Sequence, residues 1–253
     1  MLDLHTHLIG HQDRIANRQN MKDYLEAAQR AGLKEFGFAD HDMYFKELDL
    51  PLIREVAKAY PELNVRVGLE VDYRAEDEGK IKNLLQSFDF DYVIGSVHEI
   101  QNWLFDYPEE AEKHRKMEPD QLYISYFSLV EKAARSHLFT TIGHFDLIKL
   151  FGVRPRTDVR ELAEKAINAI AENGLVAELN TAGRYKPIGE FYPEEKLIRE
   201  MVNHGIDFTL GSDAHEAKLV GRDLKEGIRF LKSCGVKRLI SFQQKQKLTF
   251  PLD

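Results

Sequence analysis

The chain contains 253 residues, of which 43% are hydrophobic and 30% are charged. Its 35 lysines and arginines against 42 aspartates and glutamates give a net charge of −7, which argues against a protein that binds the phosphate backbone of nucleic acid or an anionic membrane surface. The single cysteine, Cys234, excludes an intrachain disulfide and a cysteine-based zinc motif. We find no secretory leader and no apolar run near the ~18 residues of a membrane span, so we expect one soluble, cytoplasmic domain over residues 1–253.

Short β-branched or aromatic runs alternate with longer helical patterns along the chain. The runs predict strands at residues 2–5, 35–39, 65–72, 92–97, 140–144, 175–179 and 207–210, with an eighth candidate at 237–242. Helical spacing of apolar residues predicts helices that include residues 21–31, 121–136, 159–172 and 194–203, and Gly32, Gly174 and Gly205 follow three of them as helix stops. Seven or eight βα units predict a barrel of parallel strands, with an open doubly wound sheet as the alternative. Residues 99–119 form a long connection, typical of a lid or binding loop.

Seven of the ten histidines fall at or just beyond the end of a predicted strand: His5, His7, His11, His41, His98, His144 and His215. Glu70 and Asp213 occupy equivalent positions after the third and seventh strands. The carboxyl ends of parallel barrel strands meet on one face, where active sites of this architecture are built. Nine nitrogen and oxygen donors without thiolates suit zinc, manganese or iron.

Each of these residues taken alone has a simpler structural interpretation. A lone histidine near a strand end is more often a core or surface residue than a ligand. His5 and His7 are more informative, because alternate residues of a strand share a face and both imidazoles can reach one ion. The joint placement of seven histidines is what indicates a metal centre. By contrast His114, His137 and His204 lie among charged neighbours, and we expect them to be solvated surface residues.

The chain resembles the PHP superfamily (polymerase and histidinol phosphatase) through ordered motifs that run from residue 3 to about residue 222. These motifs are Asp3-Leu4-His5-Thr6-His7, Ala39-Asp40-His41, Gly68-Leu69-Glu70-Val71-Asp72, Gly95-Ser96-Val97-His98, Ile142-Gly143-His144-Phe145-Asp146 and Gly211-Ser212-Asp213-Ala214-His215. Others are similar to the histidinol-phosphatase branch: Phe90-Asp91-Tyr92-Val93-Ile94, Trp103, Leu147-Ile148-Lys149 with Phe151-Gly152, and Asn180-Thr181-Ala182-Gly183.

The resemblance implies a distorted TIM-like (β/α)7 barrel that holds three divalent metal ions, which could be zinc, manganese or iron. By the resemblance, the first ion would be bound by His5, His7, Glu70 and Asp213. The second would be bound by His98 and His144, with Glu70 bridging the two ions. The third would be bound by His11, His41 and His215. Two loops beside the third ion depart from the family pattern, at residues 9–12 and 42–44, and Asp13 is an alternative donor to His11.

The reaction that fits this centre is hydrolysis of a phosphate monoester, with a metal-bridging hydroxide as the expected nucleophile. Glu70 and Asp213 are the expected catalytic carboxylates, because Glu70 would hold two ions and Asp213 could orient water or relay a proton. Asp40 and Asp146 sit beside histidine ligands, where they could orient an imidazole or simply cap a helix.

Binding of the phosphate also requires cationic donors, and several follow the fifth and sixth predicted strands: Lys149, Arg154, Arg156, Arg184 and Lys186. Arginine offers bidentate recognition of phosphate, and we favour Arg154 and Arg156 because their loop should border the metal cluster. Each of these charges taken alone is more often a solvated surface group. Trp103 and Asp106 could contact an imidazole or amine of the substrate, although Trp103 is equally well explained as a loop anchor.

Three functions are compatible with the sequence. The resemblance favours a histidinol-phosphatase of histidine biosynthesis, which converts L-histidinol phosphate and water into L-histidinol and phosphate. Another phosphoesterase of the same type could act instead on nucleotides or other small phosphate esters, and the acidic net charge disfavours nucleic acid. A non-catalytic metal-binding protein is the third possibility. It leaves nine donor positions unexplained, since a structural site usually closes with four.

Overall fold

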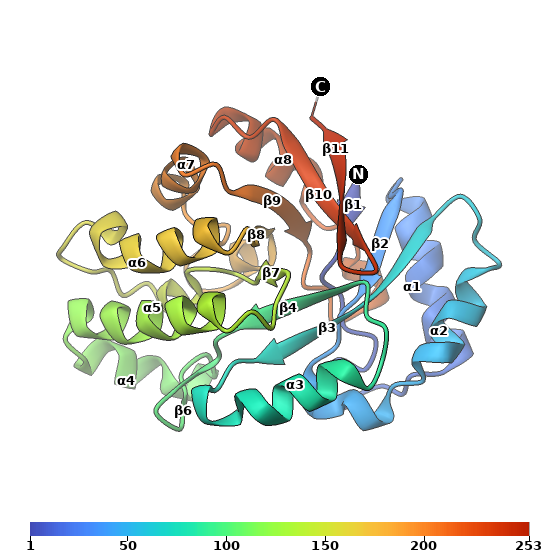
Figure 1. Ribbon diagram of the computed structural model, residues 1–253, viewed down its shortest axis with the longest axis horizontal. Coiled ribbons are helices and arrows are strands. Elements are labelled where there is room, and N and C mark those ends of the chain that lie inside the picture. Colours follow the sequence, from blue (N-terminus) through green and yellow to red (C-terminus); the bar gives the residue numbers. More distant parts are fainter. Residues whose placement is uncertain (253) are drawn as a thin grey trace.

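The computed structural model describes residues 1–252, and a largely parallel sheet forms its centre (Figure 1). The strands follow the order β1-β2-β3-β4-β7-β8-β9-β10-β11. Only β10 and β11 pair antiparallel within this sheet. Their bounds are β1 (Leu2–Asp3), β2 (Glu35–Phe38), β3 (Asn64–Asp72), β4 (Tyr92–Ser96), β7 (Thr141–Ile142), β8 (Val176–Asn180), β9 (Asp207–Gly211), β10 (Arg238–Gln243) and β11 (Gln246–Pro251).

The first seven strands of this order close into a barrel. Beyond β1, Leu4 donates its backbone N–H to Leu210 of β9 over 2.9 Å, and Thr6 pairs in parallel with Ala214. The predicted strands at residues 2–5 and 140–144 form the shorter paired strands β1 and β7. Beyond the paired residues the chain continues in an extended conformation. The architecture is the barrel of parallel strands that the sequence predicts, in the distorted TIM-like form that the resemblance implies.

The eighth candidate strand does not add another βα unit to the barrel. It forms β10, which pairs with β9 and turns back as β11, a strand that the sequence analysis missed. This hairpin packs against the amino-terminal ends of the barrel strands, where Ser241 donates to Glu35 over 2.7 Å and Phe242 stacks on Tyr92. It thereby covers the end of the barrel opposite the histidines.

Helices surround the sheet (Figure 1). They are α1 (Arg18–Arg30), α2 (Leu50–Ala57), α3 (Glu78–Gln86), α4 (Ala111–Lys116), α5 (Pro119–Arg135), α6 (Val159–Glu172), α7 (Glu195–Asn203) and α8 (Leu224–Ser233). The four predicted helices correspond to α1, α5, α6 and α7 with bounds that differ by at most three residues. Short 3-10 helices lie at η1 (Asp42–Glu47), η2 (Ala75–Asp77), η3 (Pro108–Glu110), η4 (Leu147–Lys149), η5 (Ala182–Tyr185) and η6 (Ala217–Leu219).

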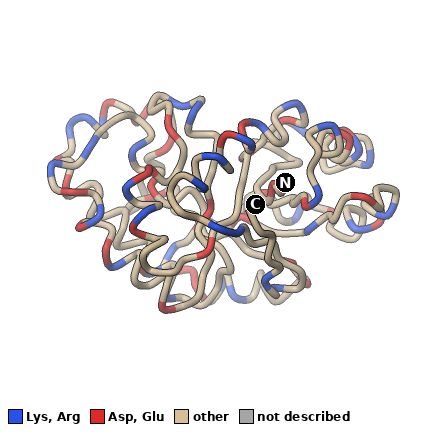
Figure 2. The backbone as a smooth tube through the Cα atoms, turned by 90° about the horizontal axis from the view of Figure 1, so that it is seen from above, with Lys and Arg blue, Asp and Glu red and all other residues tan. Residues whose placement is uncertain are grey.

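Local chemistry explains where the helices start and stop. The Asn17 side chain accepts from the Asn20 N–H, and the Asp49 side chain accepts from the Leu52 N–H, so both cap a first turn. Gly32, Gly174 and Gly205 all adopt positive φ angles directly after helices, as predicted for helix stops. No helix within residues 1–252 is long and apolar enough to cross a membrane. Acidic and basic residues are interspersed over the outer helices (Figure 2).

The segment 99–119 is more ordered than a loop. It contains a two-stranded hairpin of β5 (Glu99–Ile100) and β6 (Trp103–Leu104), followed by α4. The prediction that His114 is solvated is wrong, because its side chain is fully buried within the fold of this segment. One ring nitrogen lies 2.8 Å from the Phe105 carbonyl, and the ring packs 5.0 Å from Trp103 and 4.9 Å from Phe151. His137 and His204 are exposed as predicted.

Candidate metal centre

The predicted metal ligands lie at the carboxyl ends of the barrel strands. His5 and His7 alternate on the extended chain after β1 and are completely buried. Glu70 lies within β3, and His41 pairs with it as an isolated parallel bridge. Parallel register brings consecutive strand ends to one face, so residues far apart in the sequence meet there.

The first group of donors joins His5, His7, Glu70 and Asp213. The Nε2 atom of His7 lies 3.1 Å from Asp213 Oδ1 and 3.6 Å from Glu70 Oε2, and His5 Nε2 lies 3.3 Å from the same Glu70 oxygen. One donor atom each from His5, His7 and Asp213 falls within 4.8 Å of the others. With Glu70, these residues are the set that the resemblance to the PHP superfamily implies for the first ion.

The second group joins His98 and His144 to the other oxygen of Glu70. Glu70 Oε1 lies 3.0 Å from His144 Nε2 and 3.6 Å from His98 Nε2, and the two imidazole nitrogens are 3.3 Å apart. The two oxygens of the Glu70 carboxylate therefore lie against different groups of donors. This arrangement supports the predicted bridging role of Glu70.

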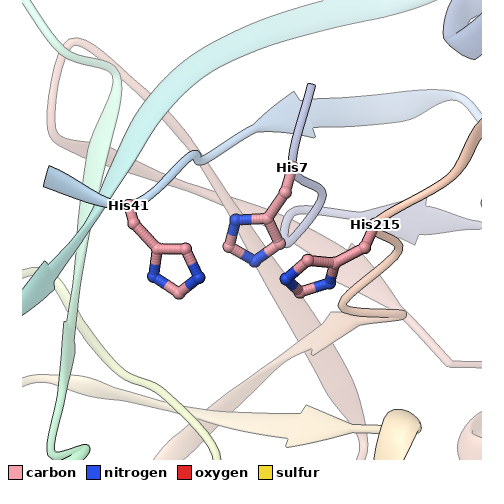
Figure 3. Close-up of side chains that lie close together, drawn as sticks. All are labelled: His7, His41 and His215. Atoms are coloured by element: carbon pink, nitrogen blue, oxygen red, sulfur yellow. The ribbon is translucent and has the colours of Figure 1, made fainter. Parts of the chain in front are cut away.

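The third group differs from the predicted set. The imidazoles of His7, His41 and His215 gather from three separate loops (Figure 3), with ring centroids 4.4 Å apart for His7 and His41 and 4.1 Å apart for His7 and His215. His11 is exposed, and its ring centroid lies 4.3 Å from that of His215. Asp13, the alternative donor, pairs with Arg14 over 3.0 Å.

Several donor atoms in this cluster are buried without a hydrogen bond. They are His5 Nε2, His7 Nδ1, Glu70 Oε2, His144 Nδ1 and His215 Nε2. Buried polar atoms are normally satisfied, so a cluster of such atoms at one place is typical of a site that holds water or an ion. Imidazole nitrogens and carboxylate oxygens are suitable ligands for divalent cations, and the residues present therefore fit divalent metal binding.

Other buried polar residues orient the donors, and the sequence analysis assigned them no role. Glu178 Oε1 lies 2.7 Å from His5 Nδ1, and its other oxygen accepts from the backbone N–H of His144. Asp72 contacts His98 Nδ1. Asn180 donates to Asp213 over 3.3 Å. The sequence signal that could have identified these residues is a polar side chain in an otherwise apolar strand, because a buried polar group needs a buried partner.

The carboxylates change the protonation of the imidazoles that they face. Burial by itself lowers the pKa of His5, but the Glu178 and Glu70 carboxylates raise it well above its usual value. For His98, too, the neighbouring carboxylates outweigh the effect of burial, and Asp72 contributes most to the raised pKa. His7 behaves in the opposite way, because burial and the neighbouring His215 and His41 lower its pKa.

Asp40 and Asp146 contact backbone and ammonium groups, and no hydrogen bond joins either of them to an imidazole within residues 1–252. Asp40 accepts from the Ile9 N–H over 2.7 Å, and burial raises its pKa to about 6. Asp146 accepts from the Glu194 N–H and lies 2.9 Å from the Lys149 ammonium group. Both carboxylates therefore hold the loops around the site.

Lys149 is not placed to contact a substrate. Its side chain is fully buried, and its ammonium group lies 2.7 Å from the Phe191 carbonyl oxygen and within ion-pair distance of Asp146 and Glu190. A side chain committed to three partners in the interior has no free donor for an entering phosphate, so the sequence prediction for Lys149 is corrected. It joins the loop after β7 to the segment that follows η5.

The three predicted arginines line one pocket of about 840 Å³ between the loop after β7 and the segment 184–196. Arg154 pairs with both Glu190 and Glu194, and Arg184 lies 3.2 Å from Asp223. Arg156 is largely exposed and anchored through its backbone. None of the nine donor residues lines this pocket. Lys186 is exposed.

Trp103 is an anchor of the segment 99–119. Its indole N–H donates to Glu110 over 2.6 Å, and the Lys113 ammonium group lies 4.3 Å from its ring centroid. The ring is buried and its polar atom is already satisfied, which favours the structural interpretation over stacking on a substrate. Asp106, in contrast, keeps a buried oxygen without a partner.

Comparison with known protein families matches a PHP domain to residues 3–182, which include seven of the nine predicted donors. The chain therefore belongs to the PHP domain family. A probable histidinol-phosphatase of Deinococcus radiodurans is 37% identical over 257 residues, which cover 96% of each chain. A histidinol-phosphatase of Bacillus subtilis is 29% identical over 86% of this chain and 94% of its own length.

The fold is shared with solved structures. A histidinol phosphate phosphatase from Lactococcus lactis, complexed with zinc, L-histidinol and phosphate, matches with a TM-score of 0.78. The match covers 98% of both chains at 22% sequence identity. A putative histidinol phosphatase from Listeria monocytogenes matches with a TM-score of 0.72 over 89% of this chain.

Proposed function

We propose that this chain is a metal-dependent histidinol-phosphatase that hydrolyses L-histidinol phosphate to L-histidinol and phosphate. The observation that carries the proposal is the cluster of imidazoles around the two oxygens of Glu70, in a chain 37% identical to a probable histidinol-phosphatase over nearly its whole length. A structural metal site usually closes with four protein ligands, whereas donor atoms of eight residues gather here in overlapping groups.

Three divalent ions are the complement that the donors support best. His5, His7 and Asp213 with one Glu70 oxygen would hold the first, and His98 and His144 with the other oxygen would hold the second. His41 and His215 would hold the third, completed by His7 or His11. Zinc, manganese and iron all accept this mixture of imidazole and carboxylate. When bound, such ions lower the pKa of water and offset the negative charge of a phosphate.

The protein's own residues hold the donors in fixed orientations. Glu178 accepts from the Nδ1 side of His5, which leaves the Nε2 lone pair directed at the cluster. Asn180 holds one oxygen of Asp213, so the other remains near His7. With both supports in place, Asp213 is positioned to orient an attacking water or to return a proton to the departing alkoxide.

Arg154 is our candidate for the phosphate contact. It is about one-third exposed at the edge of the pocket, whereas Arg156 projects into solvent. Glu190 and Glu194 each accept one hydrogen bond from its guanidinium, and a phosphate would use the remaining N–H donors. The Lys149 ammonium group lies 3.3 Å from Glu190 and helps to hold this carboxylate beside Arg154.

The proposal is tested by measuring phosphate release from L-histidinol phosphate and from a panel of nucleotide and sugar phosphates. We expect the highest kcat/KM for L-histidinol phosphate, loss of activity after chelation, and recovery on addition of zinc, manganese, iron or cobalt. Preference for a nucleotide would indicate a different phosphoesterase. Full activity in protein shown by elemental analysis to be free of metal would refute the mechanism.

A further inference from the structure

His114 of α4 is a fully buried histidine that lies outside the metal centre. Its ring packs among three other rings, with centroids 4.9 to 5.9 Å away: Trp103, Phe105 and Phe151. Within residues 1–252, none of its hydrogen bonds or ring contacts involves one of the nine donors. Burying a polar side chain costs free energy unless it is hydrogen-bonded, so the role of His114 lies in these contacts.

The hydrogen bond of His114 fixes which ring nitrogen carries the proton. Nε2 lies 2.8 Å from the Phe105 carbonyl oxygen, and a carbonyl oxygen only accepts, so Nε2 is the protonated nitrogen of the neutral ring. Nδ1 is then the acceptor nitrogen, and it is buried without a hydrogen-bond partner. A second proton would have to bind to Nδ1, where no acceptor meets it. The surroundings of His114 therefore favour the neutral imidazole.

The Phe105 peptide connects His114 to the second group of donors. Its carbonyl accepts from His114, and its N–H donates to the His98 carbonyl over 3.3 Å, which closes the β5–β6 hairpin directly after that donor. The Phe105 ring lies 5.6 Å from that of Tyr126, whose hydroxyl donates to the His144 carbonyl over 3.4 Å. The backbone carbonyls of both donors are therefore held from one aromatic cluster, in which His114 fixes the Phe105 peptide.

Charged groups face His114 from its own helix and from the segment before it. Burial lowers the pKa of His114 below its usual value of about 6.5, and Lys113 of α4 lowers it further. The hydrogen bond to Phe105 and the carboxylates of Glu110 in η3 and Asp106 after β6 raise the pKa, but by less than burial lowers it. Because the unfolded chain then binds the proton more readily, the contribution of the neutral ring is complete above about pH 6.5. It is lost as the pH falls below that value.

On the basis of the proposed function, we propose that His114 is a pH-sensitive positioning residue for the second metal ion. Its neutral imidazole holds the Phe105 peptide, which in turn holds the ligand His98. Gain of a proton places an unpaired N–H group in the interior, and the segment 99–119 opens to bring that group to water. His114 touches neither metal nor substrate, so retention of the second ion depends on a group outside the metal centre.

Two variants test this inference in the full chain with excess zinc. His114→Phe keeps a ring in the aromatic cluster and removes the donor, whereas His114→Gln keeps an N–H donor in place of Nε2 and cannot gain a proton. His204→Gln is the matched control, since His204 is an exposed histidine near the Glu200 carbonyl of its own helix.

Hydrogen exchange of peptides from residues 99–119, corrected for the intrinsic effect of pH, is the first readout. In wild type and His204→Gln, protection should fall about 10-fold between about pH 7.5 and about pH 5. In His114→Gln it should stay within about threefold over the same range. In His114→Phe it should be low at every pH.

Zinc affinity at pH 7.5, measured by competition with a chelator, is the second readout. His114→Phe should bind its weakest zinc ion about 10-fold less tightly than wild type, and His114→Gln should restore the affinity. Wild-type affinity in His114→Phe would overturn the inference, as would equal pH dependence of exchange in wild type and His114→Gln. Equal defects in both His114 variants would overturn it in favour of a packing role. Wild-type protein that folds without binding zinc would refute the proposed function, while hydrogen exchange without metal would still decide whether His114 controls the segment.

Discussion

Glu178 Oε1 lies 2.7 Å from His5 Nδ1, although 173 residues separate the two in the sequence. Both side chains are completely buried, and the second carboxylate oxygen of Glu178 accepts from the backbone N–H of His144 over 2.9 Å. One carboxylate thus orients a donor of the first group and the loop that carries a donor of the second. Carboxylates that orient ligating histidines raise the basicity of the imidazole and fix its tautomer.

We therefore predict that Glu178→Gln weakens metal binding roughly 10- to 100-fold, because the amide supplies no charge and competes poorly for the imidazole N–H. Elemental analysis after dialysis against graded chelator measures the loss. Glu172→Gln is the matched control, since Glu172 is a surface residue that pairs with Arg135. Equal metal retention in the two variants would show that Glu178 does not support the ligands.

Removal of the Glu70 charge should be more damaging than loss of His98. The carboxylate contacts both groups of donors, so Glu70→Gln should bind fewer metal ions per chain than His98→Ala and should have activity near background. Glutamine has nearly the same shape, so the fold should persist, which circular dichroism checks. A folded Glu70→Gln protein with a full metal complement and substantial turnover would contradict the bridging role.

Metal binding near neutral pH should release protons from His5, His41 and His98. Facing carboxylates raise the pKa of these three imidazoles above the usual value, which favours their protonated forms in metal-free protein, whereas ligation requires neutral rings. Calorimetry in buffers of different ionisation enthalpy counts the protons. The number should fall toward zero as the pH rises through the raised pKa values. Release that does not depend on pH would exclude this assignment.

The raised pKa of His98 also predicts how the stability of the metal-free protein depends on pH. A folded-state pKa of His98 above its unfolded value means that the ion pair with Asp72 stabilises the fold fully below about pH 6.5. That contribution is lost as the pH rises through the raised pKa. Urea unfolding of metal-free wild type and Asp72→Asn should therefore differ most between about pH 4 and 6.5, where Asp72 is ionised and His98 is protonated, and should converge at high pH. A constant difference would argue against this pair.

Arg154→Ala should lower kcat/KM for L-histidinol phosphate about 10- to 100-fold without loss of metal, while Arg156→Ala should have little effect. Arg154 is held by two glutamates at the pocket, and the Arg156 side chain is about three-quarters exposed. Arg160→Ala, which removes a surface guanidinium paired with Asp158, is the control. Wild-type kinetics in Arg154→Ala would show that the phosphate contact lies elsewhere, and Arg184 and Lys186 would then be the next candidates.

The sequence by itself predicted the barrel and the chemical types of the donors. Both rest on local patterns, because a strand is recognised from its own residues, and a histidine at its end is identified by position alone. Parallel strands then bring those ends together whatever the side chains are. The assignment of His5, His7 and Asp213 to one ion came from the resemblance to the PHP superfamily, and the structure brings one donor atom of each within 4.8 Å of the others.

Only the tertiary structure decided which side chain meets which. Glu178 lies in an apolar strand and acquires its role because closure of the barrel brings β8 beside the chain after β1. His114 has charged sequence neighbours and Lys149 is itself charged, yet both are buried because the segments that carry them fold back over aromatic residues and carboxylates. Burial and pairing depend on contacts between residues distant in the chain, and no local pattern in one sequence records those contacts.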